Sequence, residues 1–238
     1  MSVIRVPNLN EAPLLDDDTG KNISVDNSLV VGASRIAVYF RSLEARLSEH
    51  IQKADAVFGC IAWLTSKNII GKLIEKDTCI IVQKEDFLRP DMGARSNWKR
   101  ELRAAYDRLH CRLERPSFGN IIRSLQTNAD PEVQPIRCVG NHNSEKQPAF
   151  PRMHNKFLVF SRVLSTGPFN YPKIEPYGVW TGSFNLTKNA TASLENAIYT
   201  EIPEVVDAYF NEFGQIVALS EPLDWTSDWI APEWRIGT

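Results

Sequence analysis

The chain has 238 residues, of which 43% are hydrophobic and 24% charged, a composition typical of one elaborated globular domain with a sizeable core. The formal net charge of −2 excludes a global attraction to nucleic acid or to an anionic membrane, so any anion site must be local. The first residues, MSVIRVPNLNEAPLL, lack the apolar stretch of a secretory signal, and nothing in the chain approaches the about 20 apolar residues of a membrane span.

Cysteine usage indicates the redox compartment. Cys60, Cys79, Cys111 and Cys138 include no CxxC pair, and the first two lie in apolar runs. Buried, unpaired thiols are typical of a reducing compartment rather than of a disulfide framework. We therefore expect a cytoplasmic protein without integral membrane association.

Three regions are expected along the chain. Residues 1–27 are polar and predict an N-terminal arm. Residues 28–219 predict the folded domain, with insertions near 84–152 and 161–177. Residues 220–238 predict a tail that is rich in tryptophan.

The arm contains an acidic run, Asp16 to Asp18. Such a run can be a solvated loop or a carboxylate metal site. Because three adjacent acids do not easily converge on one ion, the solvated loop is favoured.

The domain is predicted to begin with a helix over residues 36–54, where apolar residues recur at spacings of three and four. A strand–helix–strand unit follows it. An apolar run over 56–64 then predicts a buried strand, and a short helix capped by Thr65 or Ser66 leads to a second buried strand over 78–83. This order is the signature of a parallel βαβ unit.

A basic helix is predicted over residues 95–115. It contains seven basic residues against three acids: Arg95, Lys99, Arg100, Arg103, Arg108, Arg112 and Arg115. A solvated helix face is the favoured interpretation. The alternative is a surface that follows phosphates, for which Lys99, Arg100 and Arg103 are the candidate nucleic-acid-binding residues.

The rest of the chain adds strands and one long helix. A short helix is expected after Pro116, and a long loop over 126–152 contains a strand near Ile136. The later elements are a strand over 156–160, a proline-rich excursion over 161–177, strands over 178–182 and 195–201, and a helix over 203–219. Together these predict an α/β fold whose mixed, largely parallel central sheet has helices on both faces.

Polar residues gather where these strands begin and end. His154 and Lys156 stand two apart at a strand start, so their side chains share a face. Ser183 and Asn185 follow Gly182 with the same spacing, where a helix is expected to begin and its N-terminus to favour an anion. Glu195 opens the next strand and could fix the tautomer of an imidazole by accepting its N–H.

The runs HNK, GSFNLT and LENA, followed by an aromatic-rich helix, resemble the phospholipase D superfamily, whose signature is His-x-Lys-x4-Asp-x6-Gly-Ser-x-Asn, often with a later Glu-Asn pair. The resemblance covers residues 150–215 and implies an αβα sandwich. It implies catalytic roles for His154, Lys156, Ser183, Asn185 and Glu195 in phosphodiester hydrolysis through a phosphohistidine, without a metal or another cofactor.

Two departures from the signature concern the strand after Lys156. Ser161 stands where the family has Asp, and 28 residues separate His154 from Ser183, against about 14 in the compact pattern. The segment after Phe160 is therefore expected to be an inserted loop that roofs the site or shapes substrate entry.

The histidine count bears on assembly. The other histidines, His50, His110 and His142, begin no His-x-Lys motif. The family's reaction uses two such motifs, so the resemblance implies a homodimer with both copies at the interface.

Alternatives remain for the metal and for the substrate. Cys138, His142 and His154 could supply three zinc ligands, but their spacing matches no standard pattern. A nuclease acting on DNA or RNA is favoured, with Phe169, Tyr171 and Tyr177 as residues that could stack on unpaired bases. A phosphatidyl-lipid enzyme and a catalytically silent nucleic-acid-binding module are the other candidates.

Overall fold

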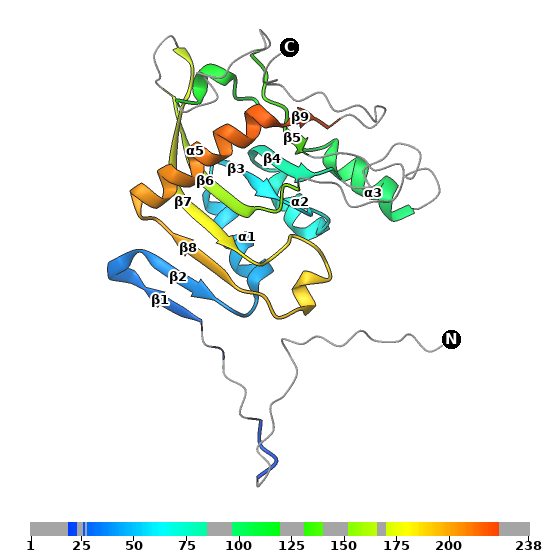
Figure 1. The fold of residues 1–238 in the computed structure, drawn as a ribbon, viewed down its shortest axis with the longest axis vertical. Helices are drawn as coiled ribbons and strands as arrows, with labels where there is room; N and C mark the ends of the chain where they lie inside the picture. Colours follow the sequence, from blue (N-terminus) through cyan, green and yellow to red (C-terminus); the bar gives the residue numbers. More distant parts are fainter. Residues whose placement is uncertain are drawn as a thin grey trace.

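A computed structural model of the protein describes residues 19–22, 26, 28–84, 97–119, 131–139, 152–165 and 170–223. Within these ranges the chain forms one nine-stranded sheet with strand order β1-β2-β8-β7-β6-β3-β4-β5-β9 (Figure 1). The strands are β1 (Leu29–Val31), β2 (Ile36–Tyr39), β3 (Ala56–Ile61), β4 (Asp77–Gln83), β5 (Ile136–Val139), β6 (Lys156–Leu164), β7 (Lys173–Gly182), β8 (Ala197–Thr200) and β9 (Glu221–Pro222). The α-helices are α1 (Leu43–Lys53), α2 (Lys67–Leu73), α3 (Asn97–Tyr106) and α5 (Pro203–Leu219).

The sheet is mixed, as predicted, but the expectation that it is largely parallel is wrong. Only β3–β4 and β4–β5 pair in parallel, while the other six pairings are antiparallel. The parallel part is the predicted strand–helix–strand unit, in which α2 connects β3 to β4. Strands β6, β7 and β8 instead follow one another without an intervening α-helix and pair antiparallel.

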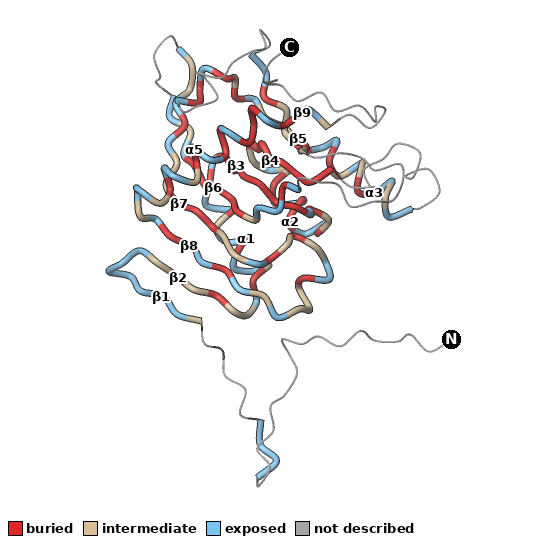
Figure 2. The backbone as a smooth tube through the Cα atoms, viewed as in Figure 1, coloured by how far each residue is buried: buried red, intermediate tan, exposed pale blue. Residues whose placement is uncertain are grey.

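Helices cover both faces of the sheet, as the alternation of buried strands predicted. Helices α1, α2 and α3 pack on one face, over a core that includes Leu47, Ile70 and Leu102. Helix α5 covers the opposite face with Phe210 and Phe213 and crosses the near side of the sheet in Figure 1. The central strands are consequently buried from both sides (Figure 2).

The helix predicted over 36–54 is correct only from Leu43 onward. Residues Ile36–Tyr39 form β2, which pairs with β8, and Ser42 has a left-handed backbone with φ 54°. The β-branched and aromatic residues of this stretch suit a pleated edge as well as a helix stripe, and pairing with β8 decides between them.

The basic helix predicted over 95–115 is also shorter than expected. Helix α3 ends at Tyr106, and the chain then runs to the start of β4, where the carbonyl of His110 accepts a hydrogen bond from the Thr78 N–H (2.9 Å). The Asp77 carboxylate accepts bonds from the Arg112 backbone N–H (2.8 Å) and from its guanidinium (2.9 and 3.1 Å). These tertiary bonds replace the helical ones that the sequence alone favoured.

The expected insertion over 161–177 is mostly a continuation of two strands. β6 and β7 remain paired out to Leu164 and Lys173, with a register shift between Phe160 and Ser161. The shift leaves Tyr177 as an extra residue on β7 and brings Pro176 opposite Ser161, and proline is tolerated in a sheet at such a bulge. In Figure 1 this extension points away from α3.

Several other expectations were confirmed or lie outside the described residues. The strands over 56–64 and 78–83, the strand near Ile136, the strand over 195–201 and the helix over 203–219 are present within a few residues of their predicted ends. The acidic run, most of the arm, most of the 126–152 loop, Phe169 and the tail tryptophans fall outside the described ranges. Among the described residues, no helix has the length and apolar character needed to cross a bilayer.

Candidate active site

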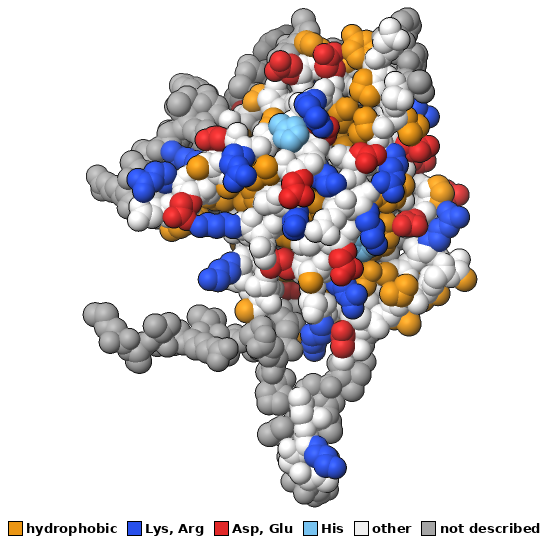
Figure 3. All heavy atoms as spheres, turned by 180° about the vertical axis from the view of Figure 1, so that it is seen from behind, with side chains coloured by type: hydrophobic (Ala, Val, Ile, Leu, Met, Phe, Trp, Pro, Cys, Tyr) orange, Lys and Arg blue, Asp and Glu red, His pale blue; other side chains and the backbone are white. Residues whose placement is uncertain are grey.

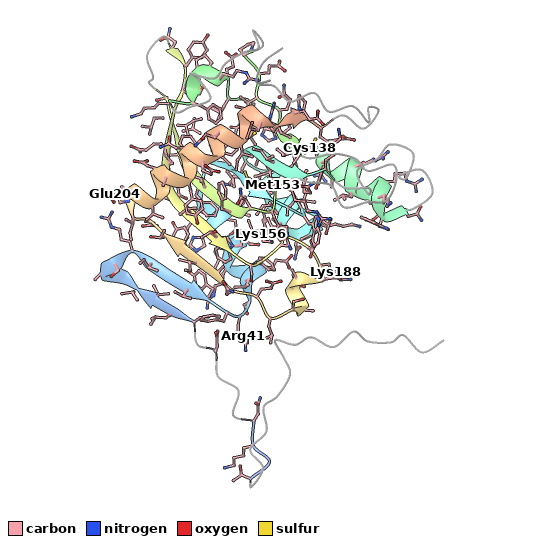
Figure 4. The ribbon with its side chains drawn as sticks, in the orientation of Figure 1. Arg41, Cys138, Met153, Lys156, Lys188 and Glu204 are labelled. Carbon is pink, nitrogen blue, oxygen red and sulfur yellow. The ribbon has the colours of Figure 1, made fainter. Side chains whose placement is uncertain are left out.

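The predicted motif residues lie at one end of the central strands of the sheet. β3 and β4 end there, β6 starts there with Lys156 opposite Ile61, and β7 ends there with Gly182 opposite Ala197 at the start of β8. The predicted motif residues therefore come from neighbouring strand ends, although nearly 30 positions separate the first pair from the second. Figure 4 shows Lys156 and Met153 near the middle of the molecule and Lys188, just after the second motif, on the side where α3 lies.

His154 and Lys156 are in direct contact. The Lys156 Nζ lies 3.2 Å from Nδ1 and 3.4 Å from Nε2 of the His154 ring, and it donates to the His154 carbonyl at 3.1 Å. His154 is exposed, while Lys156 is partly buried. Burial lowers the pKa of Lys156, and the nearby Glu195 carboxylate opposes this shift. The pair thus places an imidazole and an ammonium side by side.

Ser183 and Glu195 form the second half of the site. The Ser183 hydroxyl donates to Glu195 Oε2 and accepts the backbone N–H of Asn196 at 3.1 Å. The hydrogen-bond partner of Glu195 is therefore a hydroxyl rather than an imidazole. Its expected role in orienting an imidazole stays a prediction. The Thr181 hydroxyl, two residues before Ser183, donates to the Lys156 carbonyl at 3.2 Å, which places the two halves of the site next to each other.

The backbone at Gly182 has no room for a side chain. A Cβ built there would lie 2.2 Å from the Asn196 carbonyl oxygen and 2.8 Å from the Ala197 Cα. The close approach lets the Ser183 N–H donate to that same carbonyl at 3.1 Å. The glycine was predicted to allow close approach to a ligand, whereas here it admits the neighbouring strand.

Asn185 has an unused acceptor. Its side-chain Oδ1 is buried without a hydrogen-bond partner among the described residues, and its backbone carbonyl accepts the Thr187 N–H at 2.8 Å. The α-helix expected to begin here is absent: residues 183–189 turn, and only a 3-10 turn follows at Ala190–Ala192. Among the described residues, no α-helix therefore begins at Ser183 or Asn185.

Two residues that border the site, Gln83 and Trp63, were not predicted from the sequence. The buried Gln83 amide oxygen accepts the backbone N–H of Met153 at 2.7 Å, directly before His154. The Trp63 ring meets the His154 ring edge to face, with centroids 6.4 Å apart. Each stands alone at or just beyond a strand end, where no spacing pattern marks it.

Ser161, which stands where the resembled signature has Asp, lies far from the other motif residues. Ser161 is fully buried on β6 and pairs with Ala56 at the start of β3, the end opposite to the site. The β6–β7 extension also lies at the end of the strands opposite to the site. The expectation that it roofs the site is therefore wrong for a single chain. Tyr177 packs against the Arg162 guanidinium at 4.8 Å there, and it does not face the site of its own chain.

The candidate nucleic-acid-binding residues lie on α3. Arg100 is exposed and bonds to Asn97 (3.0 Å), Lys99 lies over the Trp98 ring (5.7 Å), and Arg103 is partly buried. The Tyr106 hydroxyl ties the end of α3 to the Leu64 carbonyl (2.6 Å), next to Trp63. The surface over α1 and α2 mixes basic and acidic side chains (Figure 3).

The cysteine of the zinc alternative lies inside the protein. Cys138 is buried, its Sγ lies 3.7 Å from Oε1 of the buried Glu221, and burial raises its thiol pKa to about 12. Glu221 is in turn paired with Lys84 at 2.5 Å. Among the described residues there is no group of three His, Cys, Asp or Glu side chains that could hold a metal; His142 lies outside them.

Comparison with known proteins establishes one family relationship. No protein-family model matches the chain. Uncharacterized protein L381 of Acanthamoeba polyphaga mimivirus is 37% identical over 215 residues, which cover 83% of this chain and 70% of the relative. The chain therefore belongs to the same family as L381.

The solved structures similar to this chain include a member of the family that its motifs resemble. Nuc from Salmonella typhimurium, a phospholipase D family member, shares 19% identity at TM-score 0.41, covering 76% of this chain and 91% of that chain. NucT from Helicobacter pylori shares 14% at TM-score 0.42, covering 76% and 95%. Phosphatidylserine synthase from Haemophilus influenzae shares 12% at TM-score 0.40, covering 85% and 43%. At such low sequence identities and TM-scores, any inference about the chemistry of the site has to rest on the residues of this chain.

Proposed function

We propose that the protein is a metal-independent phosphodiesterase that hydrolyses nucleic acid, with DNA favoured, through a covalent phosphohistidine. The observation that carries the proposal is the pairing of His154 with Lys156 beside the Ser183–Glu195 hydrogen bond. An imidazole, an ammonium, a hydroxyl and an amide carried by neighbouring strand ends supply the groups needed to attack a phosphodiester and stabilise its charge.

The reaction has two steps. A ring nitrogen of His154 bonds to phosphorus while the bond to the leaving oxygen breaks, and that oxygen takes a proton from His154 of the partner subunit. The partner's imidazole then takes a proton from a water molecule, which attacks phosphorus and breaks the phosphorus–nitrogen bond. Lys156 and the amide N–H groups of Asn185 hold the nonbridging oxygens, and Ser183 joins them when its hydroxyl turns from Glu195 to the phosphate.

The proposal requires a two-fold homodimer. Each chain contributes one His-x-Lys motif, and His154 is exposed at this end of the central strands, where a second copy could reach it. In such a dimer, Glu195 would accept an N–H from the partner subunit's imidazole in addition to its hydrogen bond from Ser183. The interface would be isologous, with the same surface used by both chains.

Nucleic acid is the favoured substrate class. Helix α3 offers Lys99, Arg100 and Arg103, and its last turn is bonded to the loop that leads from β3 to α2. Phosphate contacts of this kind make binding steeply dependent on salt. A phosphatidyl-lipid phosphodiesterase is the second candidate, since the same phosphate chemistry would serve it, and a silent nucleic-acid-binding module is the third.

Cleavage assays in excess EDTA test the proposal. Labelled single- and double-stranded DNA and RNA are incubated with the wild type, with His154→Ala, and with His110→Ala as a matched histidine control, since His110 follows α3 and lies beside the start of β4. Cleavage that persists in EDTA and in the His110 variant, but is lost in the His154 variant, is expected. Cleavage that requires added metal and survives His154→Ala would contradict the proposal, and turnover of phosphatidyl vesicles alone would favour the lipid enzyme.

A further inference from the structure

Trp63 is an exposed aromatic ring among buried neighbours. Its relative exposure is 37%, whereas Ala62 and Leu64 on either side are at 1% and 0%. Leaving an indole in water forgoes the large stabilisation that burial of an aromatic ring provides. An exposed tryptophan within a well-packed segment therefore raises the question of what covers it.

The ring stands directly beside the proposed nucleophile. The indole and the His154 imidazole are perpendicular, at 87°, with centroids 6.4 Å apart. Among the described residues His154 is the only ring in contact with Trp63, and that contact is edge to face, so none of these residues stacks on the indole face. A flat group joined to the reacting phosphate could lie on it.

The backbone that carries Trp63 is fixed by both motif segments. The Trp63 carbonyl accepts the Leu186 N–H at 3.1 Å, next to Asn185, and the Ala62 N–H donates to the Asn155 carbonyl at 3.1 Å, between His154 and Lys156. The ring thus has a set position relative to the groups that would bind phosphate. Preorganised aromatic rings bind planar ligands at low entropic cost.

We propose that Trp63 is the stacking platform for an unpaired nucleobase adjacent to the scissile phosphodiester, which makes single-stranded nucleic acid the preferred substrate. This inference rests on the proposed function. A base is separated from its phosphate by one sugar, so a ring beside His154 meets a base when phosphate occupies the site. In a duplex the bases are already stacked and must be extracted at an energetic cost.

The chemistry around the ring favours a base over an acyl chain. The segment that meets the ring is polar: His154 is in contact with it, the carbonyl of the exposed Asn155 accepts the Ala62 N–H, and Lys156 contacts His154. A single indole among polar groups suits a base, which has an apolar face and polar edges. A lipid surface would be matched by a broader apolar patch.

Binding to the inactive chain tests the platform without relying on turnover. The probes are an oligodeoxythymidylate and a strand of the same length whose sugars carry no bases, each titrated in EDTA against the full-length His154→Ala chain. Adding Trp63→Ala is expected to weaken binding of the thymidylate strand by about 5- to 100-fold and to leave the abasic strand within twofold. Trp63→Phe should retain most of the preference, and Trp63→Leu should lose it.

Three results would overturn the inference. The first is an equal loss for both strands, the second is no loss for either, and the third is a Trp63-dependent affinity for phosphatidylglycerol vesicles with no preference for bases. Tyr177→Ala, an aromatic change at the opposite end of β6–β7, is the matched control and should leave the preference unchanged. The melting temperature and molecular mass of each variant are measured as well. A lowered melting temperature or a changed oligomer mass would show that the ring serves folding or the dimer contact instead.

Cleavage of the same two strands by the otherwise wild-type chain separates the two proposals. Faster cleavage of the thymidylate strand that Trp63→Ala abolishes supports both. If the wild type cleaves neither strand but binding still depends on Trp63 and on bases, the proposed catalysis fails while the platform stands. If cleavage occurs without any preference for bases, the platform fails while the catalysis stands.

Discussion

Gln83 fixes the backbone directly before His154 through one buried hydrogen bond, from the Met153 N–H to its amide oxygen at 2.7 Å. We expect Gln83→Met, which keeps the length of the side chain, to leave that N–H without a partner. Such a loss costs about 1–3 kcal/mol. We also expect kcat to fall by about tenfold, because small displacements of a catalytic group are costly.

The measurement pairs chemical denaturation with kinetics at saturating substrate. A fall in kcat beyond the change in KM identifies a positioning role for Gln83. If Gln83→Met lowers the free energy of unfolding but leaves kcat within twofold, the hydrogen bond serves only the fold.

Two glycine-to-alanine changes should shift stability in opposite directions. In Gly182→Ala the new Cβ would meet the Asn196 carbonyl oxygen at 2.2 Å, so β7 and β8 must separate at the site, at a cost of about 1–3 kcal/mol. Gly71→Ala in α2 meets no atom within 4 Å and should stabilise the helix by about 0.5–1 kcal/mol. Thermal melting of both variants checks the signs, and an unchanged Gly182→Ala would show that the strands can shift freely.

Residues in a spaced motif were predictable, and lone residues were not. His154 and Lys156, and then Ser183 and Asn185, were singled out because each pair stands two apart, and Glu195 because it opens the next strand. Gln83 acts through a contact 70 positions away in the sequence. Trp63 follows a strand whose apolar run extends through Leu64, so the sequence did not distinguish an exposed ring from a buried one.

At the scale of elements, His50 on α1 is the group through which acid should weaken the fold. Its ring stacks on Tyr199 of β8 with centroids 3.7 Å apart. Burial lowers its pKa to about 4, Lys53 and Arg46 act in the same direction, and Glu201 opposes them. An unfolded histidine has a pKa of about 6.5, so between these values the unfolded chain binds more protons than the folded one.

The free energy of unfolding should therefore fall as pH drops from about 6.5 toward 4, by on the order of 2 kcal/mol once the partial exposure of the ring is allowed for. Urea denaturation at a series of pH values measures the effect, and His50→Phe, placed among other aromatic rings, is the comparison. The difference between wild type and variant should grow with acidity over this window. A constant difference would mean that another group carries the acid sensitivity.

Element ends depend on contacts that periodicity does not contain. The apolar spacing from Ile36 to Ala54 fits a helix throughout, but pairing with β8 makes its first four residues a strand. The basic stretch after Tyr106 has helical composition, yet Asp77 captures Arg112. By contrast, α5 begins at Pro203 and ends at Leu219 as predicted, because its apolar face is continuous and its first residue fits only the first turn.

At the scale of the whole molecule, the strand order explains two things: why the motif residues meet, and why the residues inserted between β6 and β7 lie far from them. Antiparallel order brings the start of β6, the end of β7 and the start of β8 to the end of the sheet at which β3 and β4 terminate. Any residues added between β6 and β7 are then delivered to the other end of the strands. The spacing between His154 and Ser183 could therefore grow without moving either motif, which the length of the insertion alone did not reveal.

Assembly is the remaining whole-molecule property, and mixing experiments can measure it through activity. If each catalytic centre needs His154 from both subunits, a mixed dimer of wild-type and His154→Ala chains is inactive. With random re-association at equal proportions, the activity should be about one quarter of that of the same total amount of wild type, because active dimers scale as the square of the wild-type fraction. A site complete within one chain would give about one half.

Differently tagged chains, denatured together and refolded, provide the mixture, and tandem purification isolates the mixed dimer for a direct assay. His110→Ala in place of His154→Ala should leave activity near the wild-type value at every ratio, which controls for losses on refolding. An activity that falls linearly with the His154→Ala fraction, or a chain whose mass is monomeric at assay concentration, would contradict the shared site. A monomer with full activity would require a general acid from its own chain, and the catalytic role of a second His154 would have to be abandoned.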